Sequence, residues 1–374
     1  MRPPSPLSAI LRRFRGGRDS PALRYSTRVD PVDALKRIAF LLEKQGEPTY
    51  RVRAFRNAAK TLEKLDPNEV EARSESGKWK DLPGIGEATS RAIAEAVAGE
   101  VPAYLQKLEE STVAAFPIPE AGPLRELLRG DCHVHSDWSD GGSPVEEMAR
   151  AAIALGHDYI VLTDHSPRLK VANGLTRERL LAQLDLVADL NGALAPFRIL
   201  TGIEVDILDA GALDQDDDLL ARLDVVVASV HSKLRMPRDE MTRRMVTAIA
   251  NPHLDILGHC TGRLVGQDSR MAERGSGGGR PESDFDAEMV FAACAQFDKA
   301  VEINSRPERL DPPRRLLREA VAAGCRFSID TDAHAPGQLE WQWSGCDKAV
   351  RHGIDPGQII NTRSADDLLA WANA

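Results

Sequence analysis

The 374-residue sequence predicts an α/β fold with a sheet of parallel strands, preceded by a small all-helical region. Between residues 30 and 110, apolar residues recur at helical spacing. From Asp131 onward, short β-branched runs alternate with helical stretches of about ten to fifteen residues, which is the pattern of βα units. The length of the chain also favours two domains, one of them large.

The composition narrows the class of protein. Hydrophobic residues make up 42% of the chain, enough for a sizeable core, and no apolar run approaches the roughly 20 residues of a membrane span. The five cysteines contain no Cys-x-x-Cys pair, which fits a reducing cytoplasm. The net charge of −9 argues against a wholly basic nucleic-acid coat protein, but it allows a local basic face.

The first segment, residues 1–29, is basic, with seven arginines against the single acid Asp19. Its apolar stretch from Leu7 to Leu11 is too short for the core of a signal peptide. We expect a disordered tail, and the alternative is an arm that attracts phosphate groups.

Residues 30–110 are expected to form a helical domain. A first helix is predicted from Pro31 to about Gly46, and a second from about Tyr50 to Leu65. The second helix has no acidic residue before Glu63, and four basic residues lie beside its apolar side: Arg51, Arg53, Arg56 and Lys60. This face is either an ordinary solvated surface or a surface that binds phosphate groups.

A glycine-rich turn, Leu-Pro-Gly-Ile-Gly, precedes a further predicted helix of about residues 87–98. Gly84 and Gly86 allow positive φ angles, Ile85 can plug the turn, and the N–H groups of the helix N-terminus offer a phosphate site. A plain corner between two helices is the alternative. Together with "IAFLLEKQGEPTYRVRAFRNAAKTLEKL", the turn resembles the helix-hairpin-helix domain of family X DNA polymerases, which grips the DNA backbone. The resemblance implies DNA as a partner, bound through Arg51, Arg53, Arg56, Lys60, Gly84, Ile85 and Gly86.

The sequence also departs from that family. Ala92 stands where some members carry a Schiff-base lysine, so we expect no lyase activity. Residues 111–130 contain Pro117, Pro119 and Pro123 and are interpreted as a linker. Because this linker leaves no room for a polymerase palm, we expect no polymerase activity.

Residues that commonly bind metal ions end the predicted strands. His133 and His135 lie two residues apart in one strand, so their rings face the same side, and Asp140 follows within a turn. Later strands end in further candidates: Asp164, His165, Glu204, Asp206, His231, His259, Glu302, Asn304, Asp311, Asp332 and His334. In a βα-barrel, the C-terminal strand ends form the rim where active sites are built. The sequence therefore predicts a site for several metal ions.

Residues 131–374 resemble the polymerase-and-histidinol-phosphatase (PHP) domain. The resemblance rests on His-x-His, Thr-Asp-His-Ser, Gly-Ile-Glu, Val-His-Ser, Gly-His, Thr-Asp-Ala-His and the run "EINSRPERLD". It implies a distorted (β/α)7 barrel with up to three divalent ions held by His133, His135, Asp140, His165, Glu204, His231, His259, Asp332 and His334. It further implies three ligand groups: His133, His135, Glu204 and Asp332; Glu204, His231 and His259; and Asp140, His165 and His334.

This ligand set predicts the chemistry. Mixed imidazole and carboxylate ligands suit zinc, manganese or iron better than magnesium or calcium. Such ions lower the pKa of a bound water and clamp phosphate oxygens, which points to phosphoester hydrolysis. Two assisting residues are candidates: Asp164, which can orient the ring of His165, and Arg263, which can bind substrate phosphate. A helix cap and a surface arginine are their respective alternatives, and Arg309 is expected to pair with Asp311.

Two functions follow. In the first, the helical domain holds DNA while the barrel acts as a 3′–5′ exonuclease or cleans 3′ ends during repair. In the second, the barrel is a small-molecule phosphomonoesterase of histidinol-phosphatase type, and the helical domain is a lid or an interaction surface. The net charge favours the second. We prefer the first, because a DNA-gripping module is joined to a complete ligand set, and the oligomeric state stays open.

Overall fold

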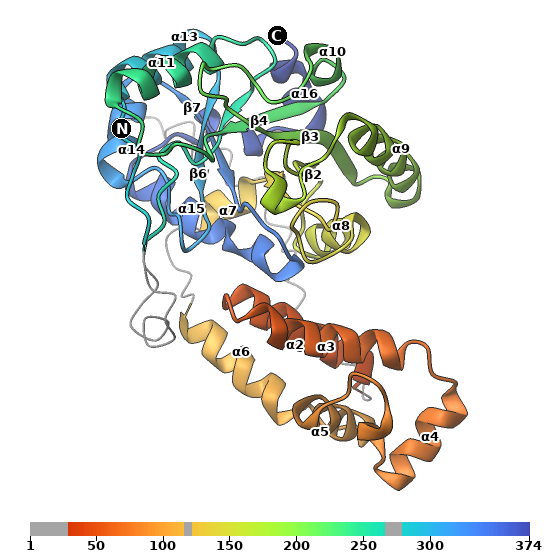
Figure 1. Cartoon of the computed structure of the whole chain (residues 1–374). Helices are drawn as coiled ribbons and strands as arrows, with labels where there is room; N and C mark the ends of the chain where they lie inside the picture. The colour runs from red at the N-terminus through yellow and green to blue at the C-terminus, as the bar shows by residue number, and fades with distance from the viewer. Residues whose placement is uncertain (1–28, 116–121, 266–278) are drawn as a thin grey trace, which may run out of the picture. The chain divides into compact units, whose positions relative to one another are not determined.

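The computed structural model describes residues 29–115, 122–265 and 279–374 (Figure 1). Nearly all of the predicted basic tail thus lies outside the described residues. The chain divides into two compact units. The first comprises the residues up to Ile38 together with Arg53–Glu109, and the second comprises Ala39–Val52 and Glu110–Ala374. The domain boundaries inferred from the sequence remain predictions. A search of the described helices finds none with the length and apolar character to span a membrane.

The N-terminal region is helical, as predicted. Its helices are α2 (Pro31–Lys44), α3 (Thr49–Leu62), α4 (Pro67–Ser76), α5 (Glu87–Val97) and α6 (Ala103–Ala115), with the 3₁₀ turn η1 (Trp79–Asp81) before α5. Asp30 caps α2, since its Oδ1 accepts hydrogen bonds from the backbone N–H groups of Val32 and Asp33 at 2.8 and 3.0 Å. Gly46 ends the helix at φ 66°, a left-handed conformation that suits glycine. The second helix ends at Leu62, three residues earlier than predicted.

The remainder of the chain is built around seven parallel strands in sequence order. They are β1 (Gly130–Val134), β2 (Tyr159–Leu162), β3 (Arg198–Asp206), β4 (Val225–Ser229), β5 (Ile256–Leu257), β6 (Ala300–Asn304) and β7 (Arg326–Asp330). A parallel bridge joins Val134 to Ala333, just beyond β7, and brings the last strand back beside the first. The sheet is thus nearly closed, which confirms the predicted distorted (β/α)7 barrel.

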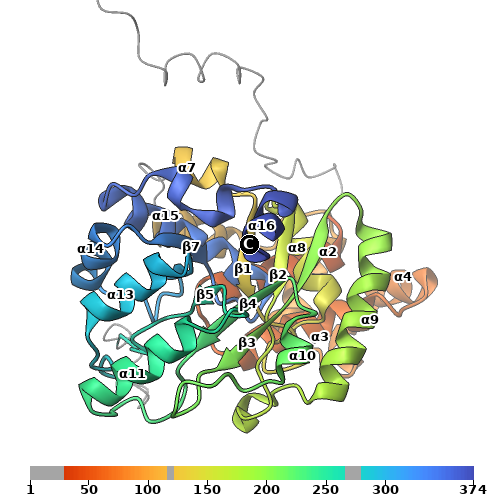
Figure 2. The same cartoon turned by 90° about the horizontal axis from the view of Figure 1, so that it is seen from above.

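Helices cover the outside of this sheet (Figure 2). They are α7 (Gly122–Leu127), α8 (Val145–Ala154), α9 (Arg177–Leu194), α10 (Asp217–Leu220), α11 (Arg238–Ile249), α13 (Ala287–Gln296), α14 (Arg314–Ala322), α15 (Gln342–Arg351) and α16 (Ala365–Ala372). Because the strands are enclosed on both faces, they are almost continuously apolar; every residue of β4, Val-Val-Val-Ala-Ser, is buried. The end of α6 and the helix α7 fall within the predicted linker, residues 111–130.

Side chains strengthen the seam between β1 and β7. The backbone N–H of Cys132 donates to Asp330 Oδ1 at 2.8 Å, and the hydroxyl of Thr331 donates to Asp131 Oδ2 at 2.5 Å. Asp131 Oδ1 also accepts the backbone N–H of His133 at 3.1 Å. The first two bonds join β1 to the C-terminal end of β7, beside the first candidate ligands.

Candidate metal centre

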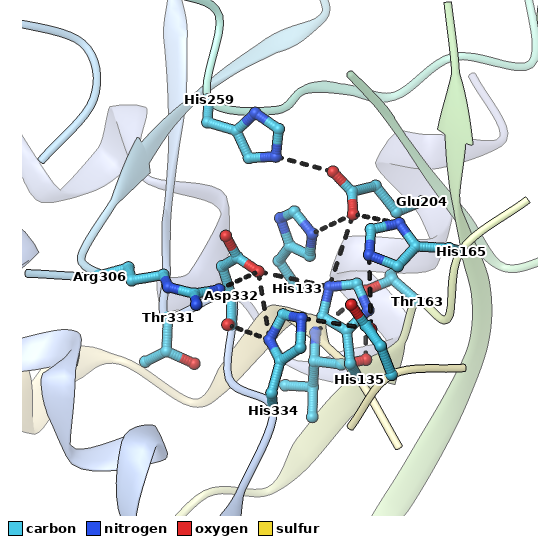
Figure 3. A network of polar contacts seen from close by, with 12 residues as sticks. His133, His135, Thr163, His165, Glu204, His259, Arg306, Thr331, Asp332 and His334 are labelled. Atoms are coloured by element: carbon cyan, nitrogen blue, oxygen red, sulfur yellow. Dashed lines mark hydrogen bonds and ion pairs between the residues drawn. The ribbon is translucent and has the colours of Figure 1, made fainter. Parts of the chain in front are cut away.

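The barrel brings all nine predicted ligands to one end. His133 and His135 come from the end of β1 and the residues after it, and Glu204 lies in β3. The remaining ligands follow β1, β2, β4, β5 and β7: Asp140, His165, His231, His259, Asp332 and His334. Figure 3 shows the rings of His133, His165 and His259 turned toward the carboxylate of Glu204. The strand-end pattern of the sequence therefore corresponds to one compact cluster.

Glu204 lies at the centre of this cluster and is 1% exposed to solvent. Its Oε1 lies 2.8 Å from His259 Nε2 and 3.2 Å from His231 Nε2. Its Oε2 lies 3.0 Å from His165 Nδ1, 3.3 Å from His133 Nε2 and 3.5 Å from His135 Nε2. Burial alone would raise the pKa of this carboxyl, but the facing imidazoles, His231 and His133 foremost, hold it well below its usual range. Glu204 is thus an ionised carboxylate facing five imidazoles.

The donor atoms form four compact groups, each within 4.8 Å. They are His135, Asp140, His165 and His334; His133, Glu204 and His259; His133, His135 and Asp332; and His165, Glu204 and His231. The outer group agrees with the predicted one, with His135 added. His231 and His259, which the resemblance assigns to one ion, fall in separate groups that share Glu204.

The donor set fits divalent ions. Both ring nitrogens of the fully buried His135 lack a hydrogen-bond partner among the described residues, an arrangement that is costly unless something else satisfies them. Burial, followed by the charges of His334 and His165, lowers the pKa of His135 to about 3. Burial, followed by the charge of Arg309, lowers the pKa of His259 to about 3. Neutral imidazole is the form that binds metal, and it is the form that His135 and His259 favour; the short distances between the donor atoms allow the cluster to hold several ions.

Two further carboxylates contact the ligands. Glu302, in β6, accepts hydrogen bonds from His133 Nδ1 at 2.6 Å and from the backbone N–H of His259 at 2.5 Å. Asp206, at the end of β3, accepts from both the backbone N–H and Nδ1 of His231, each at 3.1 Å. Both were strand-end candidates in the sequence, but the family resemblance includes neither in the ligand set.

The predicted role of Asp164 is wrong. Its carboxylate accepts from Ser136 N and Oγ at 2.8 and 2.6 Å, from Ser139 Oγ at 2.5 Å and from Gln183 Nε2 at 2.7 Å. The ring nitrogens of His165 instead face Glu204 and Asp140. Asp164 therefore holds the loop after β1, because a strand-end side chain can reach the neighbouring strand's loop more easily than the ring next to it in the chain.

The arginines also differ from expectation. Arg263 donates to the carbonyls of Arg309 and Leu310 at 2.9 and 2.5 Å and lies 3.3 Å from Glu282, so its guanidinium braces the loop after β6. These contacts argue against the predicted phosphate-binding role. The predicted Arg309–Asp311 pair is wrong as well: Arg309 Nε donates to Asp332 Oδ2 at 2.8 Å, whereas Asp311 accepts from Thr261. The sequence run "EINSRPERLD" contains Arg309 but not its partner Asp332.

The helical turn agrees with the prediction in part. Gly84 has φ 79° and requires glycine, whereas Gly86 has φ −98° and does not. Ile85 is buried, as expected of a residue that plugs the turn. Thr61 Oγ1 donates to the carbonyl of Pro83 at 3.5 Å, so the end of α3 lies beside the turn.

The basic residues of α3 are not equivalent. Arg53 and Lys60 are exposed, and Arg56 is half-buried. Their spacing of three and four residues places all three on one face of the helix. Arg51 forms an ion pair with Glu47. The helix therefore presents a basic face made mainly by Arg53, Arg56 and Lys60.

Comparison with known proteins agrees with both regions. The helix-hairpin-helix domain family matches residues 27–101, and the PHP domain family matches residues 131–306. The chain is 39% identical over 244 residues to the DNA polymerase/3′-5′ exonuclease PolX of Bacillus subtilis, a match that covers 65% of this chain and 41% of that protein. It therefore spans less than half the length of this relative.

Two other proteins are similar to part of this chain. A probable phosphatase of a Thermoanaerobacter species is 29% identical over 244 residues, which cover 62% of this chain and 89% of that protein. The crystal structure of histidinol phosphate phosphatase from Lactococcus lactis aligns with a TM-score of 0.41 at 18% identity, covering 61% of this chain and 94% of that one. With both domain matches and the ligand cluster in place, this chain carries a helix-hairpin-helix domain followed by a PHP domain.

Proposed function

We propose that this protein is a metal-dependent phosphoesterase that processes the 3′ ends of DNA, as a 3′–5′ exonuclease or a 3′-phosphatase. The observation that carries the proposal is the combination, in one chain, of a complete nine-residue ligand cluster with a helix-hairpin-helix domain. A DNA-gripping domain gives a hydrolase little advantage on small substrates, but it holds a polymer while its end is cut. The five cysteines are all free, so we place this activity in the cytoplasm.

In this proposal the nine residues of the cluster would hold up to three divalent ions, zinc, manganese or iron; Glu204 belongs to two of the four donor groups. When bound, the ions supply Lewis acidity to phosphate oxygens and acidify a water molecule. His135 and His259 contribute neutral rings, and Glu204 contributes a negative charge that offsets the cations. The guanidinium of Arg309 holds the carboxylate of Asp332 in place.

The substrate reaches the cluster from the side of Asp140. The side chain of this residue is 36% exposed and that of His334 is 17% exposed, whereas Glu204 and His133 are almost completely buried. A phosphate group arriving from solvent therefore meets the outer group first. The rings behind it cannot rearrange freely, because the packed barrel encloses them, and this rigidity keeps the ligand atoms oriented.

The helical region would supply affinity without reading sequence. The exposed Arg53 and Lys60 on α3, and the turn at Gly84, can contact backbone phosphates. Binding of this kind releases counterions and therefore weakens steeply as salt is added. Absence of DNA binding at low salt would remove the basis for this part of the proposal.

The second candidate is a phosphomonoesterase acting on small molecules such as histidinol phosphate. The net charge of −9 disfavours approach to DNA, and a probable phosphatase is similar to 62% of this chain. Under this alternative, the helical region is a lid or an interaction surface.

One experiment separates the two candidates. A 5′-labelled oligonucleotide, single- or double-stranded, with a hydroxyl or a phosphate at its 3′ end, is incubated with Mn²⁺- or Zn²⁺-loaded protein. Histidinol phosphate is tested in parallel, and the His135→Ala variant is the control. We expect shortened products or loss of the 3′ phosphate with the wild type alone. Intact DNA together with phosphate released from histidinol phosphate would instead establish the small-molecule reaction.

A further inference from the structure

Two buried carboxylates outside the nine-residue ligand set each hold one candidate ligand. Glu302 is 0% exposed and accepts His133 Nδ1–H at 2.6 Å. The same carboxylate accepts the backbone N–H of His259 at 2.5 Å, so one side chain in β6 ties together ligands from β1 and from the end of β5. A buried carboxylate with two such donors has a single orientation, and it transmits this orientation to the ring of His133.

Asp206 repeats this arrangement on the opposite part of the cluster. It is 4% exposed and accepts both the backbone N–H and the Nδ1–H of His231, each at 3.1 Å. The backbone N–H of Asp206 donates to Ser166 Oγ at 2.9 Å, which further restricts the position of this residue. The side chain is thereby fixed between β3 and the residue that follows β4.

These contacts determine which nitrogen of each ring is available. A ring that donates Nδ1–H to a carboxylate has only Nε2 left to bind an ion. His133 Nε2 lies 3.3 Å from Glu204 Oε2, and His231 Nε2 lies 3.2 Å from Glu204 Oε1. Both Nε2 atoms are buried without a hydrogen-bond partner among the described residues. Both rings therefore present the same atom to the two sides of one carboxylate.

Two of the other histidines have no hydrogen bond from Nδ1 to a carboxylate among the described residues. His334 Nδ1 faces the backbone carbonyl of Asp332 at 2.8 Å, and neither ring nitrogen of His135 has a hydrogen-bond partner in the described part of the chain. A carboxylate partner strengthens an imidazole ligand more than a neutral carbonyl does, because it stabilises the positive charge that the ring gains on binding a cation.

We propose that Glu302 and Asp206 are positioning residues, which hold His133 and His231 with Nδ1 protonated so that both Nε2 atoms bind the ions shared by Glu204. The inference rests on the ligand set proposed above and goes beyond it, because neither carboxylate belongs to the four donor groups. It also explains why two acidic side chains are tolerated in the interior of the barrel beside a third, Glu204, since each has its own hydrogen-bond donors.

The test uses Glu302→Gln and Asp206→Ala in the full chain; alanine is used at Asp206 because both donors of His231 go to Asp206 Oδ1, and an asparagine oxygen could still accept them. An amide accepts a hydrogen bond through its oxygen only, so in Glu302→Gln one of the two donors, His133 Nδ1–H or His259 N–H, faces an NH₂ group. Affinity for Zn²⁺, and separately for Mn²⁺, is measured by competition with a chelator. We expect about 10- to 100-fold weaker binding in each variant, the range found when residues behind metal ligands are changed.

Histidine-selective ¹⁵N NMR of the Zn²⁺-loaded protein supplies a readout that a general loss of stability would not produce. In the wild type, His133 and His231 should keep the proton on Nδ1 and coordinate through Nε2. Each variant should lose this signature at its own histidine and retain it at the other. The matched control is Asp255→Asn, which alters a buried carboxylate of the same barrel whose hydrogen bond goes to Val226 N; its zinc affinity should equal that of the wild type.

The outcomes are separable. If the wild type binds no metal, the proposed ligand set itself fails. If the wild type binds metal and the folded variants bind equally well with unchanged histidine signals, the positioning role is refuted while the ligand set stands. Should Glu302→Gln fail to fold, judged by circular dichroism, Asp206→Ala decides alone through His231.

Discussion

The barrel rim and the helical region each carry a candidate site, and the two differ in how their residues are held. At the rim, Glu204 and His133 are almost fully buried and their partners come from several strands. On α3, Arg53 and Lys60 are exposed. Burying polar groups is costly unless they have partners or a purpose, whereas exposed charges cost little. The contacts of the buried polar cluster thus indicate its chemistry, whereas the function of the exposed basic face has to be established by a binding measurement.

We expect the largest loss of activity from a substitution of Glu204 at the barrel rim. Glu204→Gln removes the charge that faces five imidazoles, and we expect hydrolysis of any substrate to fall by about 1000-fold or more, with loss of bound metal. Initial rates on bis-p-nitrophenyl phosphate, together with elemental analysis of the purified variant, check this. Full activity at normal metal content would show that burial of the cluster is unrelated to catalysis.

Asp255 is a buried carboxylate outside the ligand cluster, so it tests the cost of burying a carboxylate separately from metal binding. Burial raises the pKa of Asp255 to about 7, well above its usual value near 3.9. The folded state therefore binds this proton more tightly than the unfolded state, and the associated stability is lost as the pH rises from about 4 to about 7. At pH 8, metal-free Asp255→Asn should be more stable than the wild type by a few kcal/mol, at about 1.4 kcal/mol per pKa unit.

Urea unfolding of both metal-free proteins at pH 4.5 and pH 8 measures this difference. The two curves should approach each other at the lower pH, because Asp255 is then protonated in the wild type. A constant difference at both values would mean that the carboxyl is not protonated within the barrel.

The helical region should respond in binding and not in chemistry. The double change Arg53→Glu and Lys60→Glu should weaken DNA binding by about 10- to 100-fold and reduce the slope of log K against log salt by about 2, because two phosphate contacts are lost. Hydrolysis of bis-p-nitrophenyl phosphate should remain at the wild-type rate. Fluorescence anisotropy over a salt series checks the slope. Unchanged DNA binding would assign the basic face to plain solvation.

The smallest effect concerns the turn. Gly84 has φ 79° with nothing within 4 Å of an added Cβ, so Gly84→Ala is opposed by backbone conformation alone and should cost about 1–2 kcal/mol. Gly86→Ala is the matched control, because its φ of −98° suits any residue and its surroundings are equally open. The free energy of unfolding of both variants measures the difference. Equal costs would contradict the left-handed turn.

The sequence predicted much of the barrel site because the relevant signals are local. Two histidines spaced two apart in a strand must face the same side, and Glu204 and His231 could be recognised from the strands that they end or follow. Residue type and strand-end position thus gave the candidates, and the family resemblance selected nine of them. The supporting contacts did not: Asp164 was assigned to His165, its neighbour in the chain, whereas its partners are Ser136 and Ser139.

In the helical region, the local sequence predicted the positions of the helices better than the backbone conformation of individual residues. The helix from Pro31 and the buried Ile85 are as expected. The need for glycine was predicted at both Gly84 and Gly86 but is met only at the first. The φ angle of each residue depends on how the chain enters the following helix, and glycine leaves both conformations open.

By itself, the sequence determined the order of helices and strands, the strand-end position of the ligands and the chemical class of the cluster, because side-chain alternation and residue type act over a few positions. Only the tertiary structure decided which residues meet. His133 and Glu302 are 169 residues apart and are joined by the closure of the barrel, and Arg309 selects Asp332 over the nearby Asp311. Such pairings depend on strand order and register across the whole sheet, and no local pattern in the chain encodes them.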